Sequence, residues 1–137
     1  MEHPQLGTLV WDEDAYLWSG TVQGPTGRIP LGIALEERGP ISDEQIQGLN
    51  QFLEQEEALR LIIADRMLEL ANDWQAEAGK APLTASDLAG RITLKELSIE
   101  QDASLNAFYF DGGTFEGHRL LGVFDTEMNL TDADLVG

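Results

Sequence analysis

Histidine and its carboxylate neighbours are the residues of this chain best suited to acid–base chemistry. Only two histidines occur, His3 near the N-terminus and His118 in the C-terminal third. His118 follows a turn that contains Asp111 and Glu116, and either carboxylate could orient its ring as a general base. In the alternative interpretation, His118 is a strand residue whose ring bonds a nearby backbone group. We prefer the alternative, because a turn leading into a strand explains the spacing without any chemistry.

Metal and cofactor sites have little support in the sequence. The chain has no cysteine, which excludes disulfides, thiolate metal sites and cysteine nucleophiles. It also lacks the phosphate-binding glycine loops, the H-E-x-x-H zinc motif and the G-x-S-x-G nucleophile motif. The segment 125–136 begins like a calcium loop, but Leu130 stands where the loop needs glycine and Val136 where it needs glutamate. We therefore predict no metal, no cofactor and no catalytic residue.

Net charge is the most unusual property of the composition. Eight Lys and Arg against 25 Asp and Glu give a formal charge of −17 at pH 7. Such a charge disfavours binding to nucleic acid and to anionic membranes, and it would steer a basic protein partner toward the chain. Solubility alone is the competing explanation for the charge. The sequence makes no prediction of oligomeric state.

The candidate residues for partner binding combine acidic clusters with an aromatic side chain. Tryptophan is enriched among the contacts that dominate the energetics of protein interfaces, although core packing is the simpler explanation for the tryptophans here. With 25 acidic residues in the chain, some acidic pairs also arise by chance. The candidates are Asp12, Glu13, Asp14, Trp18, Glu36 and Glu37.

The first segment, residues 6–37, has the pattern of β-structure. The stretches 6–11 and 16–22 are rich in aromatic and branched residues, and the polar turn between them predicts a hairpin. In 28–36, apolar residues alternate with other residues at a period of two, which predicts a strand with one buried face. Pro30 places this strand at a sheet edge or at a strand start, because proline cannot donate a ladder hydrogen bond.

The second segment, residues 42–79, has the pattern of an amphipathic helix. Ser42 and Gln45 fit a capping box, and apolar residues then recur at spacings of three and four. The recurrence breaks between Leu53 and Leu59. An unbroken helix of about 36 residues would be about 54 Å long, which is long for so small a chain. We therefore predict a helical segment broken near 54–57, as two helices or as one helix kinked there.

The third segment, residues 84–137, begins with a short helix capped by Thr84 and continues as β-strands at 93–100, 106–111, 118–125 and 131–136. Strands, helices and strands in consecutive blocks predict an α+β fold. We expect an antiparallel sheet, made of an N-terminal hairpin or meander and a C-terminal meander, with two or three helices packed on one face.

Length and composition indicate the number of domains and the expected location of the protein. The 137 residues fit a single domain spanning 1–137. The N-terminus has no basic region followed by an apolar run, and no stretch approaches the roughly 20 apolar residues of a membrane helix. The expected location is the cytoplasm.

Short motifs spread over nearly the whole chain resemble one group of bacterial domains of unknown function. The most specific is C-terminal: an acidic-Gly turn, an aromatic residue and Gly-His at 111–118, then the acidic-Ala-acidic-x-x-Gly ending at 132–137. The hairpin around Trp11 and Trp18 and the helical stretch 43–60 are also similar. The group includes small acidic proteins that resemble those encoded beside bacterial toxin or contact-dependent competition genes. The resemblance implies an immunity-type role and a structural Gly-His pair, with no catalytic residue.

Four functions are consistent with these patterns. The first is an immunity protein that binds a basic toxin domain and occludes its active site. The second is an acidic mimic of nucleic acid that inhibits a nucleic-acid-binding enzyme. The third is an enzyme or small-ligand domain that uses His118 with Asp111 or Glu116. The fourth is an accessory domain with no specific partner. We rank them in this order.

Overall fold

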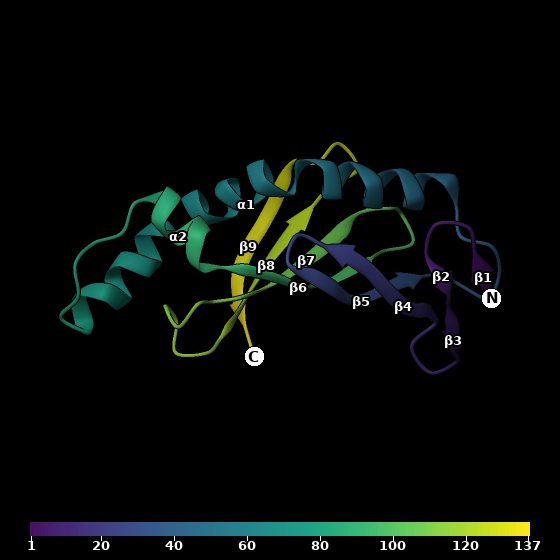
Figure 1. Ribbon diagram of the computed structural model, residues 1–137, viewed down its shortest axis with the longest axis horizontal. Helices are drawn as coiled ribbons and strands as arrows, with labels where there is room; N and C mark the ends of the chain where they lie inside the picture. Colours follow the sequence, from purple (N-terminus) through teal and green to yellow (C-terminus); the bar gives the residue numbers. More distant parts are fainter.

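The computed structural model describes residues 1–137 and shows an α+β fold in which one long helix lies across a seven-stranded sheet (Figure 1). A separate two-stranded ribbon, β1 (Glu2–His3) with β2 (Gly7–Thr8), lies beside the sheet at its N-terminal end. The strands of the large sheet are β3 (Val10–Asp12), β4 (Leu17–Gly24), β5 (Gly27–Ala34), β6 (Thr93–Ile99), β7 (Leu105–Phe110), β8 (Arg119–Phe124) and β9 (Leu130–Val136).

The sheet order is β3-β4-β5-β6-β7-β8-β9, so the strands lie side by side in the order in which the chain makes them. All neighbouring strands are antiparallel except β5 and β6, which pair in parallel with Leu31 opposite Leu97. The mixed, largely antiparallel fold agrees with the predicted class. The two predicted β segments form one sheet, because the parallel pair joins them. A parallel pair needs a long crossover, and the helices supply it.

Both helices begin at the predicted capping residues. In α1 (Asp43–Glu77), the Ser42 hydroxyl accepts from the Gln45 amide at 3.1 Å, and the Gln45 side chain accepts from the Ser42 amide at 3.1 Å. In α2 (Ala85–Arg91), Thr84 and Asp87 make the same reciprocal pair. The Gln45 side chain also donates to the carbonyls of Ala34 at 2.8 Å and Glu100 at 3.0 Å, so it joins the helix start to the ends of β5 and β6.

The prediction of two separate helices is wrong, because α1 is one continuous helix of 35 residues. At 1.5 Å per residue it is about 52 Å long, and its C-terminal turns extend past the sheet (Figure 1). There α2 packs against α1, and Trp74 packs on Phe115 of the 111–118 turn at 5.5 Å between ring centroids. The overhang is therefore covered by other parts of the chain, which removes the reason for a break.

The interruption in the apolar pattern has a different cause. The buried face of α1 runs through Phe52, Glu56, Leu59 and Ile63, so a glutamate occupies the position where the pattern lacks an apolar residue. Glu56 is 3% exposed. Leu70, which the apolar pattern had placed on the buried face, lies 37% exposed instead.

The core lies between α1 and the sheet face beneath it, and Tyr109, Phe52, Phe115 and Phe124 are its largest fully buried side chains. The helix approaches the sheet closely at Gly122 in β8, where a Cβ would lie only 2.6 Å from the Ile63 side chain. Neither helix combines the length and the apolar character that crossing a membrane requires.

Candidate functional site

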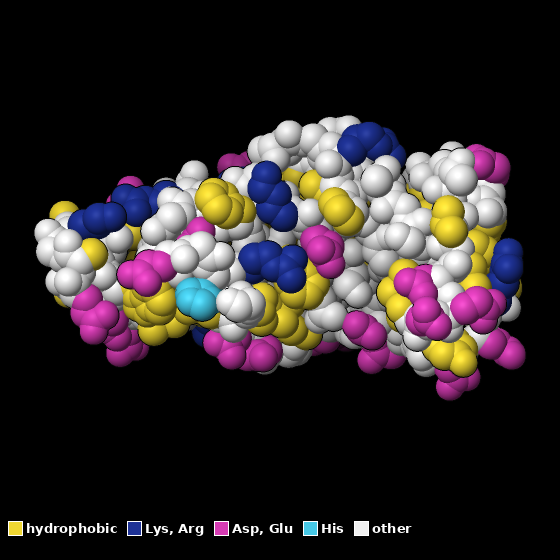
Figure 2. Space-filling view, turned by 90° about the horizontal axis from the view of Figure 1, so that it is seen from below, with side chains coloured by type: hydrophobic (Ala, Val, Ile, Leu, Met, Phe, Trp, Pro, Cys, Tyr) yellow, Lys and Arg dark blue, Asp and Glu magenta, His cyan; other side chains and the backbone are white.

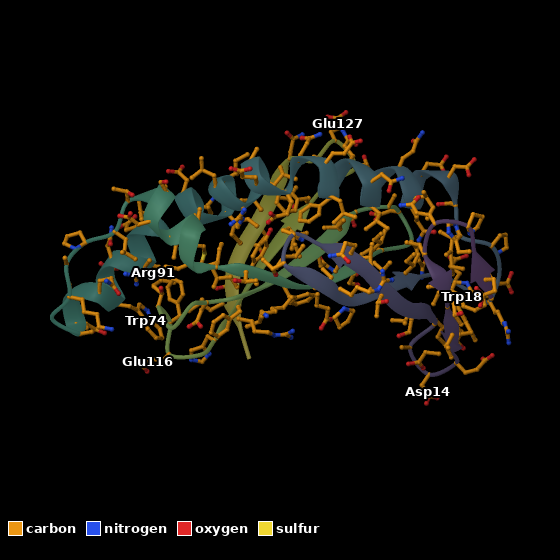
Figure 3. The ribbon with its side chains drawn as sticks, viewed as in Figure 1. Asp14, Trp18, Trp74, Arg91, Glu116 and Glu127 are labelled. Carbon is orange, nitrogen blue, oxygen red and sulfur yellow. The ribbon has the colours of Figure 1, made fainter.

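The turn between β3 and β4 presents three consecutive acidic residues to solvent. Asp12 fixes the turn, because its Oδ1 accepts from the amides of Asp14 at 3.0 Å and Ala15 at 3.1 Å. Tyr16 then adopts a positive φ of 53°, which ends the turn before β4 begins. Asp14 lies at the outer tip of the molecule (Figure 3). The local hydrogen bonds use one oxygen of Asp12 and leave the Glu13 and Asp14 carboxylates free of partners within the chain.

The second acidic cluster lies beside this turn. The Leu35 amide donates to the Tyr16 carbonyl at 3.0 Å, which places Glu36 and Glu37 next to the turn even though about 20 residues separate them in sequence. All five acidic candidates are exposed. We call this surface the acidic end; its carboxylates are Asp12, Glu13, Asp14, Glu36 and Glu37. The structure therefore brings together the acidic residues that the sequence singled out.

A hollow of about 460 Å³ opens at the acidic end. Glu36 and Glu37 line it together with Leu35, Arg38 and the segment 39–40. Tyr16, joined to Leu35 through the backbone, is 53% exposed. Figure 2, seen from the side opposite α1, shows Asp and Glu side chains gathered with apolar ones at this end. A hollow, an exposed aromatic ring and several carboxylates thus occupy one surface.

Trp18 does not share this exposure. Its side chain is 4% exposed, and its indole N–H donates to the Gly39 carbonyl at 2.8 Å. The Trp11 ring packs edge-on against the Trp18 ring, with centroids 5.3 Å apart. The Arg38 guanidinium lies 5.4 Å from the centroid of the Trp18 ring. The structure places Trp18 in the core and not on the exposed surface with the acidic candidates, and its contact with a partner stays a prediction. Trp18 supports the acidic end from beneath by holding the 38–39 backbone.

The turn after β7 is organised by one buried carboxylate. Asp111 accepts from the backbone amides of Gly113 at 3.0 Å, Phe115 at 2.8 Å and Gly117 at 2.9 Å. Burial opposes ionisation of Asp111, but the three amides outweigh it and lower the pKa of the carboxyl below its ordinary value. Gly112 must be glycine, because its φ is +64° and a Cβ would collide with the Arg91 carbonyl. The acidic-Gly turn is thus a device for folding.

His118 lies at the end of the same turn but forms no pair with its carboxylates. Its ring is packed edge-on against Trp74, and Nδ1 lies 2.8 Å from an oxygen of Gly137. The side chain is exposed, as is Glu116, which points outward from the edge of the molecule (Figure 3). Asp111 is engaged by backbone amides instead. The structure therefore does not assemble a general base from these three residues.

Sequence reasoning missed the burial of Glu56, which is 3% exposed. Glu56 receives a hydrogen bond from the Tyr109 hydroxyl at 2.7 Å and lies 3.2 Å from Nε of Arg60. The signal was present as the gap in apolar spacing between Leu53 and Leu59. Glu56 stands at the position in this gap where the helical repeat requires a buried residue. Such a glutamate indicates a buried polar contact as readily as it indicates the end of a helix.

No group of three or more His, Cys, Asp or Glu side chains is arranged to hold a metal ion. In the segment compared with a calcium loop, Asp125 accepts from the amides of Glu127 and Asn129, each at 2.9 Å. These backbone and side-chain hydrogen bonds, led by those from Asn129, lower the pKa of Asp125. The carboxylate closes the turn between β8 and β9.

The fold defines a small α+β protein of mixed, largely antiparallel topology, in which the His118 ring lies against Trp74 and Gly137. Residues 3–135 match the model of a family described as an uncharacterised protein conserved in bacteria, DUF2262. The chain belongs to this family. No curated protein and no solved structure matches the chain.

Proposed function

We propose that this protein acts by binding a basic protein through the acidic end, as an immunity protein does when it neutralises a toxin. The observation that carries the proposal is that the Asp12–Asp14 turn and the exposed Tyr16 lie next to Glu36 and Glu37, which line a hollow. Carboxylates that the fold leaves unpaired supply long-range attraction to a cationic partner. An exposed tyrosine and a hollow supply the desolvated contact that charge alone does not provide.

The immunity role is supported by the sequence resemblance as well as by this surface. The turn at 111–118 and the 132–137 ending resemble those of a bacterial group whose small acidic members look like proteins encoded beside toxin genes. In that role the acidic end covers the cationic active site of the toxin, and the Asp111 turn contributes only to folding. The net charge of −17 is consistent with a partner rich in Lys and Arg.

The direct test uses the product of the gene that adjoins the gene of this chain, expressed with and without the protein. We expect a stable complex and relief of growth inhibition in cells that make both. Association rates are then measured by stopped flow at low and high ionic strength. The test variant replaces the five carboxylates of the acidic end by amides, which keeps the Asp12 turn acceptor because asparagine retains Oδ1.

The expected result is an association rate at least about tenfold lower at low ionic strength, with a small difference at high ionic strength. A matched control replaces five other exposed carboxylates by amides and should slow association less than about threefold. Equal slowing by the two variants would reject the acidic end as the binding surface, and absence of a complex would reject the immunity role. The control residues are Asp65, Glu69, Asp73, Glu77 and Glu127.

A substitution at Tyr16 is a separate experiment, because it tests the short-range contact with the partner. Tyr16→Ala should raise the dissociation rate at least about tenfold and leave the association rate nearly unchanged. Val10→Ala is the control, since Val10 is also exposed and lies on β3 at the edge of the sheet.

A further inference from the structure

A buried ion pair under the middle of α1 has no part in the proposed function. The Arg60 guanidinium lies one helical turn from Glu56, with Nε 3.2 Å from Oε2, and Tyr109 of β7 donates to the same oxygen. Burial and the adjacent Glu56 carboxylate raise the pKa of Tyr109 far above its usual value. The hydroxyl therefore keeps its proton and remains a donor, so the core holds the glutamate in one orientation.

Each member of this ion pair keeps one unused group. Both contacts to Glu56 are made at Oε2, and no hydrogen bond within the chain uses Oε1. Arg60 donates from Nη1 to the Ala89 carbonyl at 3.2 Å, and no group of the chain accepts from Nη2. The Arg60 side chain is 24% exposed, so solvent and solutes reach it. One oxygen of Glu56 and one nitrogen of Arg60 therefore remain without a partner in the chain.

Three adjoining hollows open at this point, with volumes of about 340, 160 and 240 Å³, and Arg60 lines all of them. Their walls come from three segments far apart in sequence: the β4–β5 turn, the middle of α1, and the end of α2 with the start of β6. Glu56 lines the first two. The largest is lined by eight residues of which one is hydrophobic, so it suits a polar ligand better than an apolar one.

The charges of the hollows select the chemistry of a ligand. Glu54 and Glu57 stand on the rim of the largest hollow beside Glu56, so a simple anion is repelled. Arg60 opposes a simple cation at the same place. A zwitterion satisfies both members of the pair, because its ammonium can donate to Oε1 of Glu56 while its carboxylate accepts from Arg60 in charge-assisted hydrogen bonds.

We propose that these hollows bind a free α-amino acid. A single carbon carries both its ammonium and its carboxylate groups, and the Glu56 and Arg60 side chains that would receive them are adjacent, with Nε 3.2 Å from Oε2. Three glutamates against one arginine in the largest hollow favour amino acids with a basic side chain. Binding at this site is separate from the acidic end and stands or falls independently of the proposed function.

The experiment titrates each of the twenty L-amino acids into the protein and records calorimetric binding and the thermal unfolding midpoint. We expect L-arginine or L-lysine to bind and to raise the midpoint, with L-glutamate at least about tenfold weaker. Agmatine, which is arginine without the carboxylate, should also bind at least about tenfold more weakly. Failure of all twenty amino acids, or equal binding of agmatine and arginine, would overturn the proposal.

Two substitutions at Gly90 locate the site without disturbing the ion pair. A Cβ at Gly90 meets no atom within 4 Å, so a larger side chain enters the hollows from α2 without a clash at its base. Gly90→Phe should weaken amino-acid binding at least about tenfold, while Gly90→Ala should bind as the unchanged protein does. Both variants should unfold at the original midpoint or above it, because either residue favours a helix more than glycine. Unchanged binding by Gly90→Phe would place the ligand elsewhere.

Arg60→Lys tests the carboxylate contact itself. Lysine keeps the positive charge but lacks the planar pair of donors, so amino-acid binding should weaken at least about tenfold while agmatine binding changes little. An equal loss for both ligands would contradict the assigned role of Arg60.

Discussion

Two turns of this protein begin with an aspartate and have opposite roles. The turn that begins at Asp12 leaves most of its carboxylate oxygens in solvent, whereas the turn that begins at Asp111 directs its carboxylate inward to three backbone amides. Asp111 is fully buried, while Asp12, Glu13 and Asp14 are all exposed. An acidic residue in a turn is therefore either a folding element or a free surface charge, and its partners decide which.

Glu56 extends this comparison to a helix. It lies in the core with Tyr109 and Arg60, while Glu57, the next residue, is exposed. The net charge of −17 counts both residues equally. Only the exposed group contributes fully to attraction of a partner, because the buried one is paired and screened by its own neighbours. The predictions below test this division between internal and surface carboxylates.

The largest effect on stability is expected at Glu56. Glu56→Ala removes the acceptor of a buried hydroxyl and the partner of Arg60, which should lower the free energy of unfolding by roughly 3 kcal/mol. The matched control Glu57→Ala should change it by less than about 0.5 kcal/mol. Denaturant unfolding of the two variants gives the comparison. A loss below about 1 kcal/mol at Glu56 would mean that this buried carboxylate is dispensable for folding.

A somewhat smaller loss is expected at Asp111. Asp111→Ala leaves three turn amides without their acceptor, and we expect a loss of about 2–3 kcal/mol in denaturant unfolding. Asp14→Ala, in the exposed acidic turn, is the control and should cost less than about 0.5 kcal/mol. Similar losses in the two variants would remove the distinction between the turns.

The Asp111 turn also predicts a dependence on pH. The pKa of Asp111 is lower in the folded chain than its ordinary value of 3.8, so its ionised form stabilises the fold above that value. This stabilisation is lost as the pH falls through the folded pKa. Unfolding at a series of acidic pH values should therefore show a shallower loss for Asp111→Asn than for the unchanged protein. An identical slope would show that the amides do not hold the ionised form.

Neutralising the acidic end should have a small effect on stability, in contrast to its effect on association. With all five carboxylates replaced by amides, we expect the free energy of unfolding to stay within about 1 kcal/mol of the original and to rise at low ionic strength. The rise follows because the substitutions reduce repulsion among like charges. A loss above about 2 kcal/mol would show that these side chains help to hold the fold.

His118 is expected to give the smallest effect. His118→Ala removes an edge contact with Trp74 and one exposed hydrogen bond, so the free energy of unfolding should fall by less than about 1 kcal/mol. Binding to the partner should be unchanged. A large loss of partner binding in this variant would move the functional surface to the 111–118 turn.

Local features of this fold could be predicted from the sequence because neighbouring residues form them. The capping boxes at Ser42 and Thr84 involve residues three apart, and both helices begin where these signals place them. The hairpin of β3 and β4 and the meander of β6 to β9 followed from alternating patterns and polar turns. The length of α1 could not be predicted in the same way, because Glu56 interrupts the apolar spacing and its partner Tyr109 lies 53 residues away.

The candidate site also has some features that the sequence determines and others that depend on the tertiary structure. The sequence by itself determined which acidic residues cluster, since Asp12–Asp14 and Glu36–Glu37 are adjacent in the chain. Only the tertiary structure decided that these clusters meet, through the Leu35–Tyr16 hydrogen bond, and that Trp18 lies beneath them. Periodicity and caps depend on contacts within one turn or one strand, whereas burial of a carboxylate depends on groups that only folding brings within hydrogen-bonding distance.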